Sequence, residues 1–453
     1  MKTIHKITNK VDNTICIMVG TIIIAVITFL TIALSLFLFP RIKIKNISIS
    51  TYWIIALVGA LLILIFQLVP ISEVYNQLTA DTKINPLKII ILFFSMTMIS
   101  IFLDEFGLFQ YLASIAVKNA KGNQYVLFFS LYALVAGLTV FTSNDVVILT
   151  LTPFICFFCK RAHINPLPYL IAEFTAANTW SLMFVIGNPT NIFLATTADI
   201  DFISYFKVMA LPTLAAGIVE IIMLFSIFHH RLGEKITDVD IEKYVIHDKV
   251  TLIIGVLHLL VCLVFLVISS YINIEMWVIS LICAVSLLIY AVTHSLITKK
   301  DWDYSAGAFK KLPYPLIPFF LSMFVIVVAI NYQGISNKIA SFFGSENTIW
   351  LYGYSSFLSA NIINNIPMSI LYSNLCNNLS GLAYKQAIYS SIVGSNIGAF
   401  LTPMGALAGI MFTNLLDEHD VKLSFKQFVK YGSVIALPTI TAALGMLLVT
   451  INF

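Results

Sequence analysis

Four short polar clusters interrupt otherwise apolar sequence, and their side chains are those best placed to bind a solute. They lie at 141–145 (Phe-Thr-Ser-Asn-Asp), 187–191 (Gly-Asn-Pro-Thr-Asn), 361–367 (Asn-Ile-Ile-Asn-Asn-Ile-Pro) and 402–405 (Thr-Pro-Met-Gly). Within a membrane, broken backbone is tolerated only where it lines a cavity or is buried in protein. The N–H groups freed at a helix N-terminus can hold an anion or a polar solute there.

The four clusters occupy matching positions in the two halves of the chain. Asn178 stands nine residues before Gly187, and Asn396 stands nine residues before Gly405. Paired interruptions in corresponding halves point to a binding site at the midplane of a transporter. We therefore predict an internal repeat that builds one binding site. The alternative is that the glycines, prolines and asparagines only assist helix packing.

The clusters also predict where helices begin. Asn144 and Asn365 are residue types that favour the N-cap position. Pro189 and Pro403 each follow a residue able to cap, Asn188 and Thr402, and proline fits the first helical position.

Ionisable residues within the apolar stretches are few and are functional candidates, because burying them is costly. They are Asp145, Glu173, Glu220 and His258. Asp145 lies in a cluster and could exchange a proton or ligate a cation, or else only cap a helix. Glu173 could be a cytoplasmic gate or a proton relay. We expect Glu220 and His258 to act in helix packing.

Composition identifies the elements that must position these residues as membrane helices. Of 453 residues, 59% are hydrophobic and 11% are charged, whereas soluble domains average about 25% charged. The sequence predicts an all-α integral membrane protein with about ten transmembrane helices of roughly 20 residues. These spans are expected near 15–39, 51–71, 88–103, 167–198, 203–230, 249–271, 275–297, 313–332, 386–415 and 429–451.

Two further apolar stretches, 124–160 and 347–376, each carry a polar cluster at the centre and are predicted to be re-entrant hairpins. Short amphipathic segments, 104–118 and 333–344, precede them. With hairpins, most of the 26 lysines and arginines fall on one face, which the positive-inside rule makes cytoplasmic. The first hairpin then opens from the cytoplasm and the second from outside, so the repeats are inverted.

This pattern divides the chain into three parts. Residues 15–230 form the first inverted repeat, with hairpin 124–160 and broken span 167–198. A cytoplasmic linker covers 231–248. Residues 249–453 form the second repeat, with hairpin 347–376 and broken span 386–415.

Other classes of protein fit poorly. The net charge of +4 gives no reason to expect a nucleic-acid partner, and the six cysteines show no metal or disulfide spacing. His258 and His294 look isolated, so no catalytic metal pair and no enzyme is expected. A channel would need a continuous pore instead of two gates. We expect no cofactor, with Na⁺ or H⁺ as the coupling ion.

Several motifs together resemble the ion transporter superfamily, over nearly the whole chain. Within it they are most similar to the arsenite-efflux permease and citrate-transporter-like branch. The motifs are Ser143-Asn144-Asp145, Gly187-Asn188-Pro189-Thr190-Asn191, Asn364-Asn365-Ile366-Pro367 and Asn396-x-Gly398-x3-Thr402-Pro403-x-Gly405.

The resemblance implies a scaffold and a transport domain in each protomer, elevator-type movement and a homodimer in the cell membrane. Some relatives also use a separate ATPase subunit. It implies that the following residues line the substrate site: Ser143, Asn144, Gly187, Asn188, Thr190, Asn364, Asn365, Thr402 and Gly405. We assign coupling-ion roles to Asp145, Glu173, Asn178 and Asn396.

The dicarboxylate branch carries a Ser-Asn-Thr tip in both hairpins, whereas this chain has Ser-Asn-Asp and Asn-Asn-Ile-Pro. The sodium/proton antiporter branch places acidic residues in its span breaks, and both breaks here lack them. The expected function is secondary transport of a small anion or oxyanion, first arsenite or antimonite efflux coupled to protons. The alternative is sodium- or proton-coupled transport of citrate, other di- or tricarboxylates, or another inorganic anion.

Overall fold

A computed structural model describes residues 2–39, 41–44, 47–80, 85–233, 246, 248–298 and 307–452. Most of the predicted linker 231–248 lies outside these ranges. The elements of the first half are α1 (Lys2–Leu38), β1 (Arg41–Ile44), β2 (Ile47–Ser50), α2 (Thr51–Ile65), α3 (Ile71–Thr79), α4 (Pro86–Glu105), α5 (Leu108–Ala120), α6 (Gln124–Phe141), α7 (Asn144–Arg161), α8 (Leu167–Trp180), η1 (Val185–Gly187), α9 (Pro189–Thr197), α10 (Phe202–Phe228) and η2 (His229–Arg231).

In the second half, the regular elements of the described residues are all helices. Its elements are α11 (Lys249–Ile272), α12 (Met276–Thr298), α14 (Leu316–Tyr332), α15 (Ile335–Phe343), α16 (Thr348–Ile363), α17 (Asn365–Cys376), α18 (Gly381–Gly398), α19 (Leu407–Glu418) and α20 (Phe425–Thr450). The small antiparallel pair β1–β2, with Arg41 opposite Ser50, was not expected from the sequence. Strand-forming isoleucines alternate there with polar residues, a pattern too short to distinguish from a loop.

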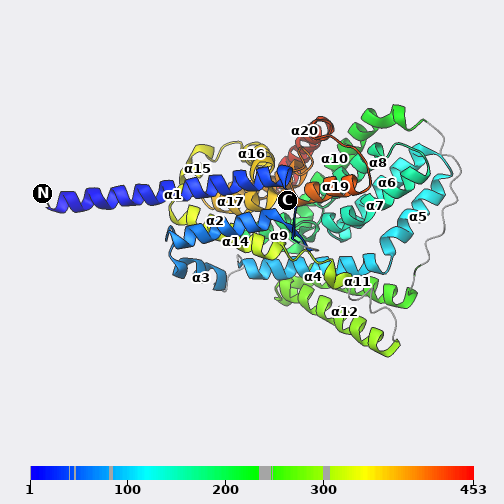
Figure 1. Ribbon diagram of the computed structural model, residues 1–453, viewed down its shortest axis with the longest axis horizontal. Coiled ribbons are helices and arrows are strands. Elements are labelled where there is room, and N and C mark those ends of the chain that lie inside the picture. The colour runs from blue at the N-terminus through cyan, green and yellow to red at the C-terminus, as the bar shows by residue number, and fades with distance from the viewer. Residues whose placement is uncertain are drawn as a thin grey trace.

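The order of elements repeats along the chain. The run α4 to α10 contains a long helix, a short helix, a helical pair, a broken helix and a final long helix, and α14 to α20 contains the same series. The correspondence extends to single residues, because Gly107 before α5 and Gly334 before α15 both adopt positive φ, at 84° and 68°. Figure 1 shows α5–α7 at the right of the helix bundle and α15–α17 at its left, with α1 running on beyond them.

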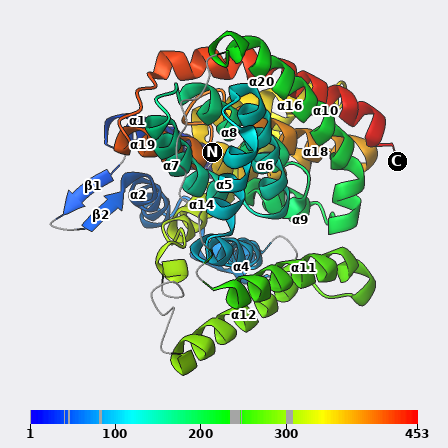
Figure 2. The same ribbon diagram turned by 90° about the vertical axis from the view of Figure 1, so that its right-hand side faces the viewer.

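The two halves are packed across each other. Helix α2 packs on α14 of the second half, and α12 packs on α4 of the first half. The hairpin arms cross in the same way, because α7 contacts α19 and α17 contacts α9. The last helices of the halves, α10 and α20, pack together. Figure 2 shows α10 and α20 at one edge of the molecule, with α11 and α12 at the opposite edge.

The outer faces of the helices are apolar. On α11 and α12, Ile253, Val264, Ile282 and Ile289 are each about 60% exposed. Exposed apolar surface of this extent needs a cover, and lipid supplies it. Together with the length of the helices, this places the protein in the membrane as a multi-pass protein.

Two of the ten predicted spans, 167–198 and 386–415, were expected to be broken, so eight uninterrupted spans were predicted. Among the described residues, seven helices are long and apolar enough to cross a membrane, or eight if the bent pair α14–α15 is one span. The predicted spans 167–198 and 386–415 are broken at their polar clusters, and 51–71 ends early because α2 stops at Ile65. Helix α6, predicted as a hairpin arm, is itself long enough to span.

Polar contacts connect segments that the charge pattern assigns to one face. Arg41 pairs with Glu418 at 3.4 Å, and the Tyr125 hydroxyl donates to the His229 carbonyl oxygen at 3.1 Å. The amphipathic segment predicted at 104–118 starts later, because Asp104 and Glu105 belong to the end of α4, where they pair with Lys311. Burial lowers the pKa of Lys311, but the two carboxylates raise it by more than burial lowers it. The ammonium therefore stays charged.

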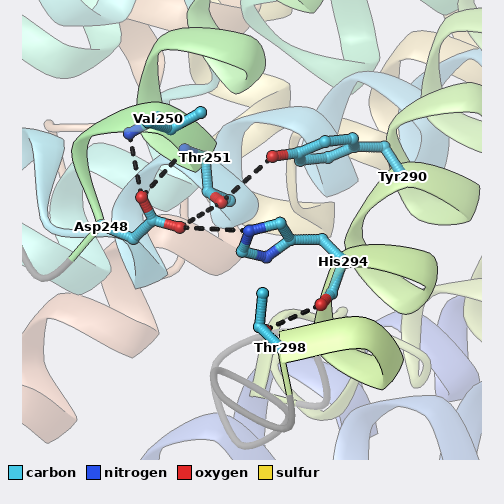
Figure 3. Close-up of polar contacts among 6 residues, drawn as sticks. All are labelled: Asp248, Val250, Thr251, Tyr290, His294 and Thr298. Atoms are coloured by element: carbon cyan, nitrogen blue, oxygen red, sulfur yellow. Dashed lines mark hydrogen bonds and ion pairs between the residues drawn. The ribbon is translucent and has the colours of Figure 1, made fainter.

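The start of α11 is also held by a carboxylate. Asp248 accepts hydrogen bonds from the backbone N–H groups of Val250 and Thr251 at 2.9 and 3.3 Å. His294 of α12, which looked isolated in the sequence, places Nε2 3.8 Å from Asp248 Oδ2 and stacks on Tyr290 (Figure 3). The cluster therefore fixes the start of α11 against the end of α12.

Candidate substrate and ion site

The first polar cluster forms the tip between α6 and α7. Helix α7 begins at Asn144 and its N-cap is Ser143, one residue earlier than we predicted. The Asn144 side chain is therefore free to reach α8, where its Nδ2 donates to Asn178 Oδ1 at 3.1 Å. Asn178 in turn donates to the carbonyl of Phe174 at 2.8 Å. The tip is thus anchored to α8 through two asparagines that the sequence had assigned to the site.

The second cluster lies in the break between α8 and α9. Here Asn188 is the N-cap of α9 and Pro189 is its first residue, as predicted, and Asn188 Oδ1 accepts from the Thr190 backbone N–H at 3.1 Å. The Thr190 hydroxyl also donates to Asn188 Oδ1, at 3.0 Å, and accepts from Ser395 of α18 at 2.8 Å. The first broken span is therefore bonded to the second one.

Asn396 of α18 is the centre of this cross-repeat connection. Its Nδ2 donates to Asn191 Oδ1 at 2.6 Å and to the Ile392 carbonyl at 2.9 Å, and its Oδ1 accepts from Ser181 at 2.8 Å. Asn191 donates to the Ser181 carbonyl at 2.8 Å. All of these side chains are buried. The amide of Asn396 is fully used within the protein, which favours a structural role over the predicted binding of a coupling ion.

The third cluster forms the tip between α16 and α17. Helix α17 begins at Asn365, and its N-cap is Asn364, again one residue before the predicted cap. Asn364 has φ 71° and ψ 153°, a backbone conformation that residues other than glycine rarely adopt. Its side chain holds that geometry by accepting from Ile366 N at 3.3 Å and donating to the Met404 carbonyl at 3.1 Å. Strain that is held in this way is typical of functional sites.

The fourth cluster does not begin a helix, and the prediction for Pro403 was wrong. Helix α19 begins at Leu407 with Ala406 as its N-cap. Thr402 instead is bound by Asn361, whose Oδ1 accepts from the Thr402 backbone N–H at 3.0 Å and from its hydroxyl at 2.7 Å. A proline after a capping residue is compatible with a turn as well as with a helix start, and here the bond from Asn361 selects the turn.

The two glycines of the breaks allow close backbone contacts. A Cβ on Gly187 would lie 2.3 Å from the Ser181 carbonyl oxygen, and one on Gly405 would lie 2.5 Å from that of Gly398. Asn365 N also donates to the Gly405 carbonyl at 3.0 Å, which joins the second tip to the second break. Both glycines, predicted to line the substrate site, are thus needed first to fold the breaks.

Several buried polar atoms at the clusters have no partner in the described part of the chain. They are Ser143 Oγ, Asn144 Oδ1, Asn188 Nδ2 and Asn365 Oδ1. Buried polar groups are almost always satisfied, so four at the polar clusters indicate a ligand. Three are oxygen atoms able to accept or to coordinate a cation, and one is an N–H donor.

The two acidic candidates lie apart. Asp145 is partly buried, makes no hydrogen bond or ion pair with a described residue, and is close enough to Tyr52 of α2 to act on it electrostatically. Glu173 is buried on α8 and accepts a hydrogen bond from Thr152 of α7 at 2.9 Å. Thr152 is two helical turns along α7 from the tip. Asp145 is therefore a residue of the tip, whereas Glu173 lies away from it.

Ser181, Ser395 and Asn361 were not among the predicted site residues, yet each bonds to a cluster residue. Ser395 is adjacent to Asn396 and Asn361 lies within the third cluster, so their positions in the sequence could have identified these two. In the part of the chain that the structure describes, no lysine or arginine bonds to a cluster residue, and no group of three His, Cys, Asp or Glu could hold a metal ion. Amide and hydroxyl groups therefore dominate the chemistry of the site.

Crossed halves with broken membrane helices and buried, unsatisfied polar atoms at the breaks define a membrane transporter. Residues 36–394 match the citrate transporter family, and the chain belongs to that family. It is 24% identical over 377 residues to the arsenical pump membrane protein of Escherichia coli K12, covering 80% of this chain and 86% of that protein.

Two further relatives extend the likeness. The putative arsenical pump membrane protein of Bacillus subtilis is 24% identical over 432 residues, covering 89% of this chain and 94% of that one. The crystal structure of the YdaH transporter of Alcanivorax borkumensis is similar with a TM-score of 0.58 at 13% identity, covering 96% and 98% of the two chains. The structural likeness shows the fold, and the family supports anion transport across the cell membrane.

Proposed function

We propose that this protein exports arsenite or antimonite in exchange for protons. The observation that carries the proposal is a set of buried polar atoms without a hydrogen-bond partner: Ser143 Oγ, Asn144 Oδ1, Asn188 Nδ2 and Asn365 Oδ1. Within the described ranges, no lysine or arginine side chain bonds to the polar clusters that hold these atoms. Arsenous acid is mostly a neutral trihydroxy species near neutral pH, so it can donate to the three oxygens and accept from the amide. The names of the relatives in Escherichia coli and Bacillus subtilis support the same substrate.

The proton is assigned to Asp145. This carboxyl is the acidic group of the first tip and has no hydrogen-bonding partner among the described residues, so a change in its charge is not compensated locally. A neutral substrate moving one way and a proton moving the other can then use the same tip in turn.

The test is arsenite accumulation in everted membrane vesicles with an acidic interior. We expect uptake that depends on the pH gradient, is lost in Asp145→Asn, and is retained in Asp417→Asn, which neutralises an exposed carboxylate at the end of α19. Uptake by the wild type that is no greater than that of empty vesicles would exclude arsenite. Uptake that is unchanged in Asp145→Asn would remove the proton from this residue.

The second candidate is transport of citrate or another di- or tricarboxylate, driven by Na⁺ or protons, and the family match favours it. Three unpartnered oxygens could coordinate a cation that accompanies the carboxylates. Sodium-dependent uptake of labelled citrate, with Asn144→Ala and Asn365→Ala as site variants, separates this function from arsenite export.

We also propose that the protein is a homodimer, in which the transport domain moves past a fixed scaffold. Whether a separate ATPase subunit energises it is tested by the same vesicles, because ATP would then support uptake after the pH gradient is collapsed.

A further inference from the structure

Glu220 is a buried carboxyl for which the mechanism above has no role. It lies on α10, eight residues before the helix ends at Phe228, or about 12 Å along the axis. The side chain is fully buried, and neither carboxyl oxygen has a hydrogen-bond partner among the described residues. A carboxyl at such depth is costly, and an unsatisfied one calls for an explanation.

The groups next to this carboxyl are hydroxyls, which carry no charge. They come from Tyr132 of α6 and from Thr175 and Thr179 of α8. Helices α11 and α20 also pack on α10 but bring no charged group of the described residues to Glu220. An ionised carboxylate would therefore lack a counter-charge, and the uncharged acid is the form that this environment favours.

The protonation state of Glu220 decides which hydrogen bonds the surrounding hydroxyls can make with it. Tyr132 donates to the Gly217 carbonyl at 2.9 Å, so its hydrogen is directed away from Glu220. Thr175 donates to the Ala172 carbonyl at 3.4 Å, whereas the Thr179 hydroxyl has no partner. The acid form of Glu220 can donate to Thr179, whereas an ionised carboxylate can accept from Thr179 and would gain a second donor if the Tyr132 hydroxyl turned away from Gly217.

The Tyr132 hydroxyl is also the acceptor for Trp180, at 3.1 Å from Nε1. The indole ring lies directly on Gly217, where an added Cβ would be 2.6 Å from the ring. Trp180 ends α8 and precedes Ser181, which bonds to Asn396. Tyr132 is thus connected through Trp180 to the end of α8 that opens into the break between α8 and α9.

We propose that Glu220 binds and releases a proton during transport, and that Tyr132 and Trp180 transmit this change to the binding site at the end of α8. In the step concerned, the carboxylic O–H bond breaks, the proton passes to water and the carboxylate remains. The Tyr132 hydroxyl then turns from Gly217 to the carboxylate. The transport test of this proposal rests on the proposed exchange of arsenite for protons, whereas the spectroscopic test does not depend on it.

The spectroscopic test needs no substrate. The purified protein is titrated with base while the infrared carbonyl band of protonated carboxyls is recorded, for the wild type, Glu220→Gln and Thr213→Val. Thr213 is buried on the same helix and donates only to the Met209 carbonyl, at 2.7 Å, so it controls for a lost polar group on α10. We expect a titrating band in the wild type and Thr213→Val that is missing in Glu220→Gln. If the spectrum of Glu220→Gln shows the same titrating bands as that of the wild type, the proposal is overturned.

The transport test compares exchange with driven uptake in proteoliposomes. We expect Glu220→Gln to exchange labelled arsenite for unlabelled within about twofold of the wild type, but to lose at least tenfold of the uptake driven by the pH gradient. Driven uptake equal to that of the wild type would refute a role in coupling. If the wild type itself carries no arsenite, all variants fail alike, and the infrared titration still decides whether Glu220 exchanges a proton.

Tyr132→Phe separates transmission from packing. It keeps the ring and the carboxyl but removes the hydroxyl, so we expect the infrared band of Glu220 to persist with a shifted midpoint and Trp180 fluorescence to lose its pH dependence. Fluorescence that follows pH as in the wild type would show that Tyr132 does not transmit the change.

Discussion

Replacing Asn396 by alanine tests whether the contact between the broken spans is structural. The change removes a fully buried amide that bonds to Asn191, Ile392 and Ser181. Asn191 Oδ1 then loses its partner, which costs about 1–3 kcal/mol for a buried polar group, and a lost neutral hydrogen bond adds about 1 kcal/mol. The expected loss of stability is about 2–4 kcal/mol, or roughly 30- to 700-fold in the unfolding equilibrium at 1.4 kcal/mol per factor of ten.

The matched control is Asn374→Ala, because the Asn374 amide donates only to the Ile370 carbonyl, at 3.0 Å within the same helix. A single neutral hydrogen bond contributes about 1 kcal/mol, so the control should cost no more than that. Unfolding of the purified protein by detergent titration measures both. In Asn396→Ala/Asn191→Ala, the costs should fall short of additivity by about 1–2 kcal/mol, since each single change leaves the other amide without a partner.

The opposite result is also informative. If Asn396→Ala is as stable as Asn374→Ala but has lost transport, the amide binds substrate or ion and the structural reasoning is wrong. Additive costs in the double variant would likewise show that the two amides do not depend on each other.

Three further changes have defined expectations. Gly187→Ala places a Cβ 2.3 Å from a backbone oxygen and should abolish folded protein on size-exclusion chromatography, whereas Gly137→Ala, with nothing within 4 Å, should be neutral or stabilising. Partial burial raises the pKa of Asp248, but hydrogen bonds from the Thr251 hydroxyl and from the backbone N–H groups of Thr251 and Val250 outweigh burial and hold the pKa below its ordinary value. Its ionised cap thus stabilises above about pH 3.9, the unfolded pKa, and is lost as pH falls through the lower folded pKa; Asp248→Ala should cost about 1 kcal/mol at pH 7 and progressively less near pH 3 in thermal unfolding. Lys311→Ala leaves Glu105 without its cation and should cost about 1–3 kcal/mol, while Lys311→Arg should restore most of it; equal thermal midpoints for the two variants would contradict this ion pair.

The sequence was sufficient for the class of fold and for the position of the breaks. Apolar stretches with polar centres correctly predicted helix pairs that meet at 142–143 and at Asn364, because lipid permits few other arrangements of such residues. The division into two inverted repeats and the roles of the individual site residues stay predictions.

Other features depended on tertiary contacts that sequence spacing does not report. The N-caps are Ser143 and Asn364 instead of the predicted Asn144 and Asn365, because Asn144 bonds to α8 and Asn365 bonds to Gly405. Thr402 lies in a turn because Asn361, a residue 41 positions earlier, bonds to it. Local propensity treats such residues as equally able to cap a helix or to form a turn.

The crossed packing of α2 on α14 and of α12 on α4 has a consequence for biosynthesis. When the first half has left the ribosome, α2 and α4 are in the bilayer, but the helices that cover them have not yet been made. The insertion machinery must therefore keep those faces from wrong partners until α12 and α14 arrive, and neither half forms a finished structure alone. A chain cut within residues 234–245 should regain its fold only when both pieces are inserted together in one membrane.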